Sequence, residues 1–416
     1  MSHYLTVLLA CLCCVSLPNV GHAADTSWQY RLLQQVNQHQ AGLWQRQTPN
    51  SRIHNLNLQY QQQSDNQQLQ LAASSWLTEQ AGADDADYEV SEAWWAIDVA
   101  DWNLSVGKRK RDFDVNQALR PLDMFSPTDP LALFTLVAPG VWQAAADWFG
   151  SDNALTLLCN ESQQPFLRYG KRLDASWGCG GRYYQQQGSA EWQAVVHHDA
   201  AMGWRIGGSW QQVLSDALAL QSSWLWQQHS WQTAWIDWPA VIATTQPAAT
   251  TSAMPGNTPI KLDRPLVQVV GDRAAWQFSA GLNYSTTRYN LLLEYGLDGQ
   301  APADQAWRAL QHRLAQGKLQ PIELRTSQQL FGSARISRQQ WLLHLRSHDN
   351  THWQHAVTLL YQPAVRGLLM SASLSYSTGQ HSSFNIGIKH FTGATDNAFA
   401  LLGLRSEAVA GVSYVF

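Results

Sequence analysis

The stretch LRSEAVAGVSYVF, residues 404–416, alternates apolar and polar side chains along most of its length. One parity carries the residues Ala408, Ala410, Val412, Tyr414 and Phe416. The other parity carries the residues Glu407, Val409, Gly411, Ser413 and Val415. The stretch GLLMSASLSYST, residues 367–378, repeats this pattern. Alternation with a period of two predicts β-strands that have one apolar and one polar face.

The three residues Gly411, Tyr414 and Phe416 together resemble the C-terminal insertion signal of bacterial outer-membrane β-barrels. Val409 departs from that signal, which usually has a polar residue at this position. The resemblance implies delivery to the outer membrane by the barrel-assembly machinery. The alternative is a soluble β-sandwich whose last strand ends in a phenylalanine by chance.

Composition agrees with a barrel in a membrane. The chain has 416 residues, of which 14% are charged, and its net charge of -4 argues against a nucleic-acid partner. The 21 tryptophans exceed what a soluble core needs, and tryptophan prefers the interface between membrane and water. The mean hydropathy of -0.29 is low because only alternate residues of a barrel face lipid. We therefore expect contact with outer-membrane lipid and lipopolysaccharide.

The N-terminal residues 1–23 are expected to be a secretory signal peptide. The apolar run 5–17 is too short to span a bilayer as a helix, and Gly21-His22-Ala23 offers a cleavage site. Residues 8–11 also resemble a lipoprotein box, which is the alternative. No later segment has roughly 18 consecutive apolar residues, so helical spans are excluded.

The mature chain is expected to consist of an N-terminal periplasmic segment, residues 24–50, and a barrel, residues 51–416. The spacing of the apolar residues Trp28, Leu32, Leu33 and Val36 predicts a short amphipathic helix in the first part.

Alternation predicts about nineteen strands in the barrel part, while bacterial barrels have an even number. We therefore expect an all-β, transmembrane antiparallel β-barrel of about 18 strands, within a range of 16 to 18, with long extracellular loops. The candidate strands are 56–60, 69–73, 95–99, 102–106, 141–149, 152–159, 164–171, 175–185, 189–198, 203–211, 216–227, 230–238, 274–285, 288–297, 336–348, 353–362, 366–377, 381–390 and the closing stretch.

The direction of the strands gives a further test. If Phe416 lies in the periplasm, the long connections all fall on the outer side, where barrels carry their long loops. These connections are 111–140, 239–273, 298–335 and 391–405. Within 298–335, the spacing of Trp307, Leu310 and Leu314 predicts a short helix over residues 304–315.

Only two cysteines lie beyond the signal peptide. Cys159 and Cys179 fall on candidate strands that are two apart in the strand series. Two strand spacings of roughly 4.8 Å exceed the comfortable reach of a disulfide, so free, buried thiols are expected.

The densest charge is the run Lys108-Arg109-Lys110-Arg111 at the end of a candidate strand. Alternation from Trp102 predicts that Arg109 and Arg111 point into the lumen and that Lys108 and Lys110 point outward toward lipid phosphates. Inward arginines facing an acidic loop would form a constriction that selects solutes by charge. The alternative is a stabilising cluster of ion pairs at the root of a loop. The full set of pore or constriction candidates is Arg109, Arg111, Asp112, Asp114, Arg120, Asp123, Glu294 and Arg346.

Two stretches resemble the alginate-export-like porins and related uncharacterised outer-membrane barrels. The first is SEAWWAIDVADWNLSVGKRKRDFDVNQALRPLDMFSPTDP, residues 91–130, with a basic strand end and an Arg-Pro-Leu-Asp loop at 120–123, followed by Pro139-Gly140. The second is the hairpin AGLNYSTTRYNLLLEYGLDG, residues 280–299, with the acidic–aromatic pair Glu294-Tyr295. Residues 112–114 replace the family's usual Trp-Gly. The resemblance implies an outer-membrane channel for an exported polymer or a small solute.

Catalysis is not expected. Six histidines lie in or beside candidate strands, but no Gly-x-Ser-x-Gly turn, completed metal-ligand pattern or phosphate-binding glycine loop accompanies them. We therefore expect no cofactor and no metal. A channel for polar solutes is the leading hypothesis. The alternatives are a gated or structural barrel with a periplasmic partner, an outer-membrane hydrolase and a soluble secreted β-protein. The histidines are His197, His198, His344, His348, His352 and His355.

Overall fold

The structure is a computed structural model of the chain. It describes residues 25–39, 51–80, 83–124, 140–162, 176–200, 202–233, 267–270, 274–301, 337–348, 352–379, 381–393 and 404–415. The predicted signal peptide, the predicted helix at 304–315 and Phe416 lie outside these ranges.

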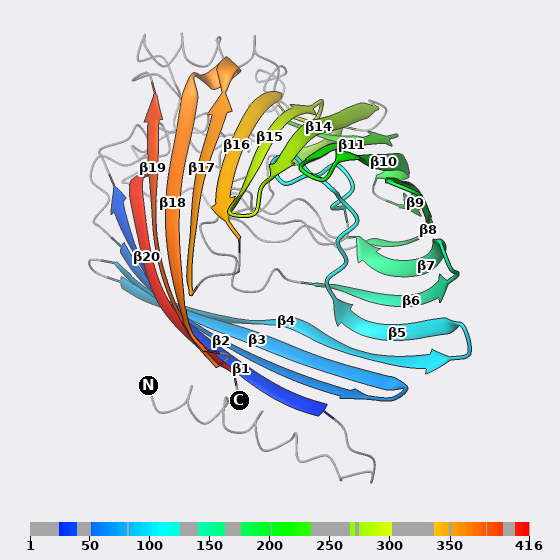
Figure 1. Cartoon of the computed structure of the whole chain (residues 1–416), viewed down its shortest axis with the longest axis horizontal. Coiled ribbons are helices and arrows are strands. Elements are labelled where there is room, and N and C mark those ends of the chain that lie inside the picture. Colours follow the sequence, from blue (N-terminus) through cyan, green and yellow to red (C-terminus); the bar gives the residue numbers. More distant parts are fainter. Residues whose placement is uncertain are drawn as a thin grey trace, which may run out of the picture.

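Eighteen antiparallel strands form one closed barrel, as predicted (Figure 1). The barrel closes because β1 pairs with β20 on one side and with β2 on the other. Among the described residues, no helix is long and apolar enough to cross a membrane. The barrel strands are β1 (Asp25–His39), β2 (Ser51–Ser64), β3 (Gln67–Gln80), β4 (Ala83–Val99), β5 (Trp102–Arg109), β6 (Val141–Phe149), β7 (Asn153–Ser162), β8 (Ser176–Gln187), β9 (Ala190–Asp199), β10 (Gly203–Ser215), β11 (Leu218–Gln227), β14 (Ala275–Ser285), β15 (Tyr289–Asp298), β16 (Gln339–Ser347), β17 (Trp353–Gln362), β18 (Gly367–Thr378), β19 (Ser382–Gly393) and β20 (Leu404–Val415).

Alternation places apolar residues outside and polar residues inside. On β14, Trp276 is 57% exposed on the outer face, while its neighbour Gln277 and the next inward residue, Ser279, are buried. β15 repeats this arrangement, with outward leucines and inward Asn290 and Glu294. The barrel therefore has the reverse arrangement of a soluble protein, since its apolar residues are on the exposed face and its polar residues are inside.

The N-terminal segment differs from the prediction. Residues 25–39 form the barrel strand β1 and not an amphipathic helix, so the barrel begins before residue 51. Tyr30 lies opposite Tyr414 in the register of β1 with β20. The helical spacing was misleading because Leu33 points inward and Gln34 interrupts the outward apolar series.

Two candidate strands are not among the strands of the barrel. The candidate 164–171 lies wholly outside the described residues, within 163–175, and β7 and β8 on either side of it pair with each other directly. The candidate 230–238 contains only β12 (Ser230–Thr233), which pairs with β13 (Val267–Val270) in a separate two-stranded sheet. If these two are removed from the nineteen candidates and β1 is added, the remaining set matches the strands of the observed barrel.

The prediction for the cysteines is wrong. Because β7 and β8 are neighbours, Cys159 lies directly opposite Cys179, and the two form a disulfide with their Cα atoms 4.0 Å apart. Both residues are exposed on the outer face, where Leu157 and Trp177 also lie. The extra candidate strand at 164–171 caused this error.

The long connections agree with the prediction. Successive antiparallel strands place the connections 110–140, 228–274, 299–338 and 394–403 at one end of the barrel. Asp25 and Val415 lie at the other end, where the turns are short, as between β2 and β3 or between β8 and β9.

Candidate functional site

A segment without regular secondary structure, Lys110–Met124, follows β5 and lies inside the barrel (Figure 1). We call it the inner segment. Its side chains and backbone bond to inward residues of β6, β9, β11 and β15. All of these strands belong to one side of the barrel, so the segment narrows the lumen from that side.

An arginine–carboxylate pair fixes the beginning of the inner segment. The Arg111 guanidinium donates to both carboxylate oxygens of Asp147 on β6, at 2.9 and 2.8 Å, and both side chains are only 8% exposed. Its Nε donates to Gln143 at 2.7 Å, and Thr156 on β7 donates to Asp147. A bidentate pair of this kind fixes direction as well as position.

The strand end before the segment departs from simple alternation. Gly107 has a φ of 126°, and after it Lys108 is buried, with its ammonium bonded to Glu89 at 3.1 Å and to the Val90 carbonyl at 2.6 Å. The prediction that Lys108 meets lipid phosphates is therefore wrong. Lys110 lies beyond the strand, so alternation does not apply to it.

Arg109 lies on the inner side of the wall. Its guanidinium stacks over the ring of Trp94, 4.2 Å from the centroid, and Trp94 belongs to the buried, inward parity of β4. The Lys110 backbone N–H donates to Glu92 on the same strand.

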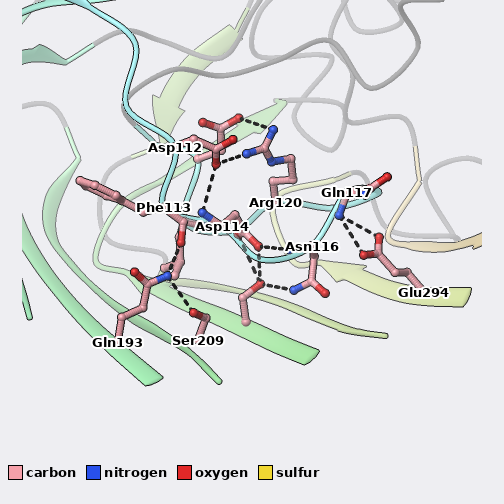
Figure 2. Close-up of polar contacts among 12 residues, drawn as sticks. Asp112, Phe113, Asp114, Asn116, Gln117, Arg120, Gln193, Ser209 and Glu294 are labelled. Carbon is pink, nitrogen blue, oxygen red and sulfur yellow. Dashed lines mark hydrogen bonds and ion pairs between the residues drawn. The ribbon is translucent and has the colours of Figure 1, made fainter. Parts of the chain in front are cut away.

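Asp114 stabilises the conformation of the middle of the inner segment and attaches it to β11. Its carboxylate accepts from the backbone N–H groups of Asn116 at 2.9 Å and Leu122 at 2.7 Å, and from the Ser223 hydroxyl at 3.0 Å. Asn116 donates to the same Ser223 hydroxyl (Figure 2). Burial raises the pKa of the Asp114 carboxyl above its ordinary value, although these hydrogen bonds oppose the rise.

Arg120 forms the charged edge of the inner segment. It bonds to Asp112, and its other guanidinium nitrogen lies 3.8 Å from Asp123 (Figure 2). Burial alone would lower the pKa of Arg120, but the carboxylates of Asp123 and Asp112 raise it above its ordinary value. Asp112 is the most exposed partner, with a side chain 42% exposed, so this end of the pair can meet a solute.

Glu294 on β15 binds residues 117 and 118 of the inner segment. Its carboxylate is fully buried and accepts the backbone N–H of Gln117 at 2.9 Å and that of Ala118 at 2.6 Å (Figure 2). Gln221 on β11 donates to it at 2.7 Å. A carboxylate that accepts several N–H groups gives charge-assisted hydrogen bonds, which are stronger than neutral ones.

Apolar packing supports these polar bonds. On β9, Gln193 donates to the Phe113 carbonyl and to Ser209 of β10 (Figure 2). One buried cluster joins the segment to the wall through Phe113, Leu122, Met124, Val141, Ala145, Leu158, Val195 and Leu225.

At two positions the wall beneath the inner segment has a glycine, which leaves room for the segment to lie close against the wall. A Cβ on Gly207 would lie 2.6 Å from the Leu122 Cδ2 atom, and one on Gly296 would lie 2.8 Å from the Leu119 Cβ atom. Both distances are shorter than real contacts, so larger residues would displace the segment.

The structure thus brings most of the pore candidates together. Arg109, Arg111, Asp112, Asp114, Arg120 and Asp123 lie in or beside the inner segment, and Glu294 joins them from a distant part of the chain. Arg346 lies apart, exposed on β16 near the end of the barrel that holds Val415.

Sequence reasoning missed the wall partners Asp147, Gln193, Gln221 and Ser223. Each falls on the polar parity of its strand, but nothing local distinguishes it from its polar neighbours. Within the described ranges, no cluster of histidine, cysteine and carboxylate residues could hold a metal ion.

In the candidate insertion signal, Gly411 allows close packing, because a Cβ there would overlap the Leu33 side chain. Tyr414 is partly exposed on the outer face and lies beside Tyr30 of β1, with ring centroids 6.0 Å apart.

The fold is similar to that of several solved structures. Acinetobacter baumannii OccAB1 has a TM-score of 0.56 and 9% identity, covering 94% of this chain and 96% of that one. Acinetobacter baumannii OccAB4 has a TM-score of 0.55 and 9% identity, covering 96% and 100%. Pseudomonas aeruginosa OccK8 (OprE) has a TM-score of 0.52 and 11% identity, covering 95% and 98%. At such identities the likeness establishes the fold alone.

No protein-family model matches the chain, and no curated protein matches its sequence. The similar structures are outer-membrane porins of the Occ type and not alginate-export-like porins. They support the predicted porin-type barrel, but not the narrower family.

Proposed function

We propose that this protein is an outer-membrane channel for polar solutes, in which the inner segment forms the narrowest part of the passage. The observation that carries this proposal is the attachment of the segment to one side of the lumen, through Asp147, Gln193, Ser223 and Glu294. A segment held to one side narrows a passage without needing to fill it.

The opposite wall supports passage of hydrated solutes. Several of its inward residues bond through hydroxyls and amides, as in Ser375 to Asn385 at 2.6 Å and Ser383 to Ser413 at 2.6 Å, and the charges of Lys389 and Glu407 are buried in an ion pair with each other at 2.8 Å. Such groups replace contacts with water without holding a solute by charge. The charged edge of Asp112 and Arg120 then supplies selection from the segment side.

The outer face supports a location in a membrane. On β14, the aromatic residues Trp276 and Tyr284 are both exposed and lie near opposite ends of the strand. Eight residues of a strand tilted by about 40° rise roughly 20 Å, close to the apolar band of about 25 Å in such barrels. In this orientation Val415 faces the periplasm and the long connections face outward.

Ion pairing of the inner segment also favours a second candidate, a barrel gated by movement of this segment. Its attachment to the wall consists mainly of hydrogen bonds and one ion pair, Arg111 with Asp147, which a periplasmic or extracellular ligand could exchange. Transport of a polymer, implied by the resemblance to alginate-export-like porins, is the narrower version of the channel. In each case the function is passage or its control, without covalent chemistry.

Single-channel recording tests the proposal. We expect the purified, folded barrel in a planar bilayer to give discrete, reproducible conductance steps in potassium chloride. Folding is checked by heat-modifiable mobility on gels, and heat-denatured protein is the control. A folded barrel that gives no conductance at any voltage would contradict the open channel. Conductance that appears only after the Arg111 and Glu294 attachments are removed would support the gated barrel.

A further inference from the structure

The inward face of β1, β2 and β3 carries a group of glutamines toward the periplasmic end of the barrel. On β2 they share the parity of Asn57, which is buried and bonds to Ser74 of β3. The register pairs the glutamines of β1 and β3 with those of β2. We call this group the amide array, and its members are Gln29, Gln59, Gln61, Gln63 and Gln68.

The amide array is open to the lumen. Each of its side chains is half-exposed or exposed, and none of them makes a hydrogen bond within the described part of the chain. Gln70, the next inward residue of β3, differs because it donates to Glu92 at 2.6 Å. Side chains on one face stand about 5 Å apart across neighbouring strands and roughly 7 Å apart along one strand. The array therefore offers closely spaced amide donors and acceptors to a solute in the lumen.

The charged residues around the amide array do not favour an anion. On β1, Asp25 lies at the rim of the inward face and Arg31 lies at the other border of the array. On β4, Glu92 and Asp98 are the inward acidic neighbours. Within the described part of these strands, the border of the array therefore holds three carboxylates and one guanidinium. An anionic solute would meet repulsion there and would find no cation among the glutamines.

We propose that the amide array binds a neutral, hydroxyl-rich solute, that is, a saccharide, during its passage. A carboxamide both donates and accepts hydrogen bonds, and so does each hydroxyl of a sugar, so the two kinds of group satisfy each other in either direction. A cationic solute would be attracted to the carboxylates of the border, but an ammonium only donates and leaves the amide N–H groups without an acceptor. The inference rests on the channel proposed above and adds the class of its solute.

The position of the amide array suits a solute that passes the inner segment. β2 lies halfway round the barrel from β11, whose Ser223 holds Asp114 of the segment (Figure 1). Because the inner segment narrows the lumen from the side of β11, the free passage lies nearer the wall that carries the array. Several exposed amides bind a solute through many weak contacts, which hold it briefly and still let it leave.

Interruption of the single-channel current by added solute tests the proposal. Two probes are compared at equal concentration: maltotriose, which is neutral, and trigalacturonate, which has as many rings but a carboxylate on each. We expect maltotriose to interrupt the current and trigalacturonate to do so roughly fivefold less often, because the border of the array repels its charge. In Gln59→Ala/Gln61→Ala, the maltotriose interruptions should become about fivefold shorter or more, as expected for the loss of two hydrogen bonds.

The matched control is Gln186→Ala/Gln211→Ala, which removes two lumen-facing glutamines of β8 and β10 outside the array. Both double variants should keep the heat-modifiable mobility of a folded barrel and its conductance without solute, and the control should keep the original interruption times. Equal shortening in both double variants, interruptions by trigalacturonate but not by maltotriose, or none by either solute would overturn the inference alone. A folded barrel that does not conduct would defeat the proposed channel, and this inference with it.

Discussion

The backbone N–H of Ala118 donates a 2.6 Å hydrogen bond to the carboxylate of Glu294, although 176 residues separate the two in the sequence. Ala118 belongs to the inner segment and Glu294 to the inner face of β15. This bond connects the middle of the inner segment to the wall.

Replacing Glu294 should release the inner segment. In Glu294→Ala the N–H groups of Gln117 and Ala118 and the Gln221 amide lose their acceptor, and each unsatisfied buried group costs about 1–3 kcal/mol. We expect a noisier channel with a larger conductance in single-channel recordings. Glu191→Ala, which removes a lumen-facing carboxylate of β9, is the matched control. Unchanged conductance and noise in Glu294→Ala would show that the segment does not set the width.

The pair Arg111 and Asp147 should matter most for stability. Arg111→Met leaves the buried carboxylate of Asp147 without its cation, and breaking such a pair costs about 3–5 kcal/mol. The double variant Arg111→Met/Asp147→Leu removes both charges and should recover most of this loss. Urea unfolding followed by tryptophan fluorescence measures both. Equal destabilisation of the single and double variants would contradict the pairing argument.

Attachment of the inner segment should depend on pH through Asp114. Burial raises the pKa of its carboxyl in the docked segment, so docking takes up a proton. The stabilisation of docking by this proton is complete at a pH below the ordinary aspartate pKa. It is lost as the pH rises through the raised pKa of Asp114 in the docked segment. Arg120 lowers the Asp114 pKa and so narrows the pH range over which docking depends on Asp114. The charge of Glu294 also lies near Asp114.

We therefore expect channel noise to decrease as the pH falls from neutral into the acidic range, measured in planar bilayers. Asp114→Asn, which cannot titrate, should show less of this decrease. An identical pH profile in Asp114→Asn and the original protein would assign the effect to another group.

The disulfide on the outer wall should stabilise the barrel moderately. It joins residues 20 positions apart, and closing a loop of this length restrains the unfolded chain by about 3 kcal/mol. We expect Cys159→Ser/Cys179→Ser to unfold at lower urea concentration than the oxidised protein. Reductant should shift the original protein to the same midpoint and leave the double variant unchanged. A midpoint insensitive to reductant would indicate that the bond does not form.

The alternating pattern determined much of the fold in advance. It predicts about nineteen strands, close to the eighteen of the barrel, and it predicts the inward and outward residues of strands such as β14 and β15, because only one face of each meets lipid. It fails where a local irregularity changes the phase, as Gly107 does for Lys108. It also fails for β1, where Gln34 interrupts the apolar series.

The candidate site was only partly accessible from sequence. The charged run at 108–123 identifies the inner segment, since charge concentrated beside a strand end is unusual in this chain. Its attachment to Glu294 and Gln193 could not be predicted, because each lies far along the chain and resembles the other polar residues of its strand. The disulfide was missed because a wrongly placed strand separated the two cysteines.

The pairing of β1 with β20 has a consequence for how the barrel is made. Nearly the whole chain lies between these two strands, so the last seam can form only after the other strands are in register. Until then both edges carry unpaired N–H and C=O groups, which lipid cannot satisfy. Closure and entry into the bilayer are therefore expected to occur together, as one slow step dominated by contacts distant in sequence.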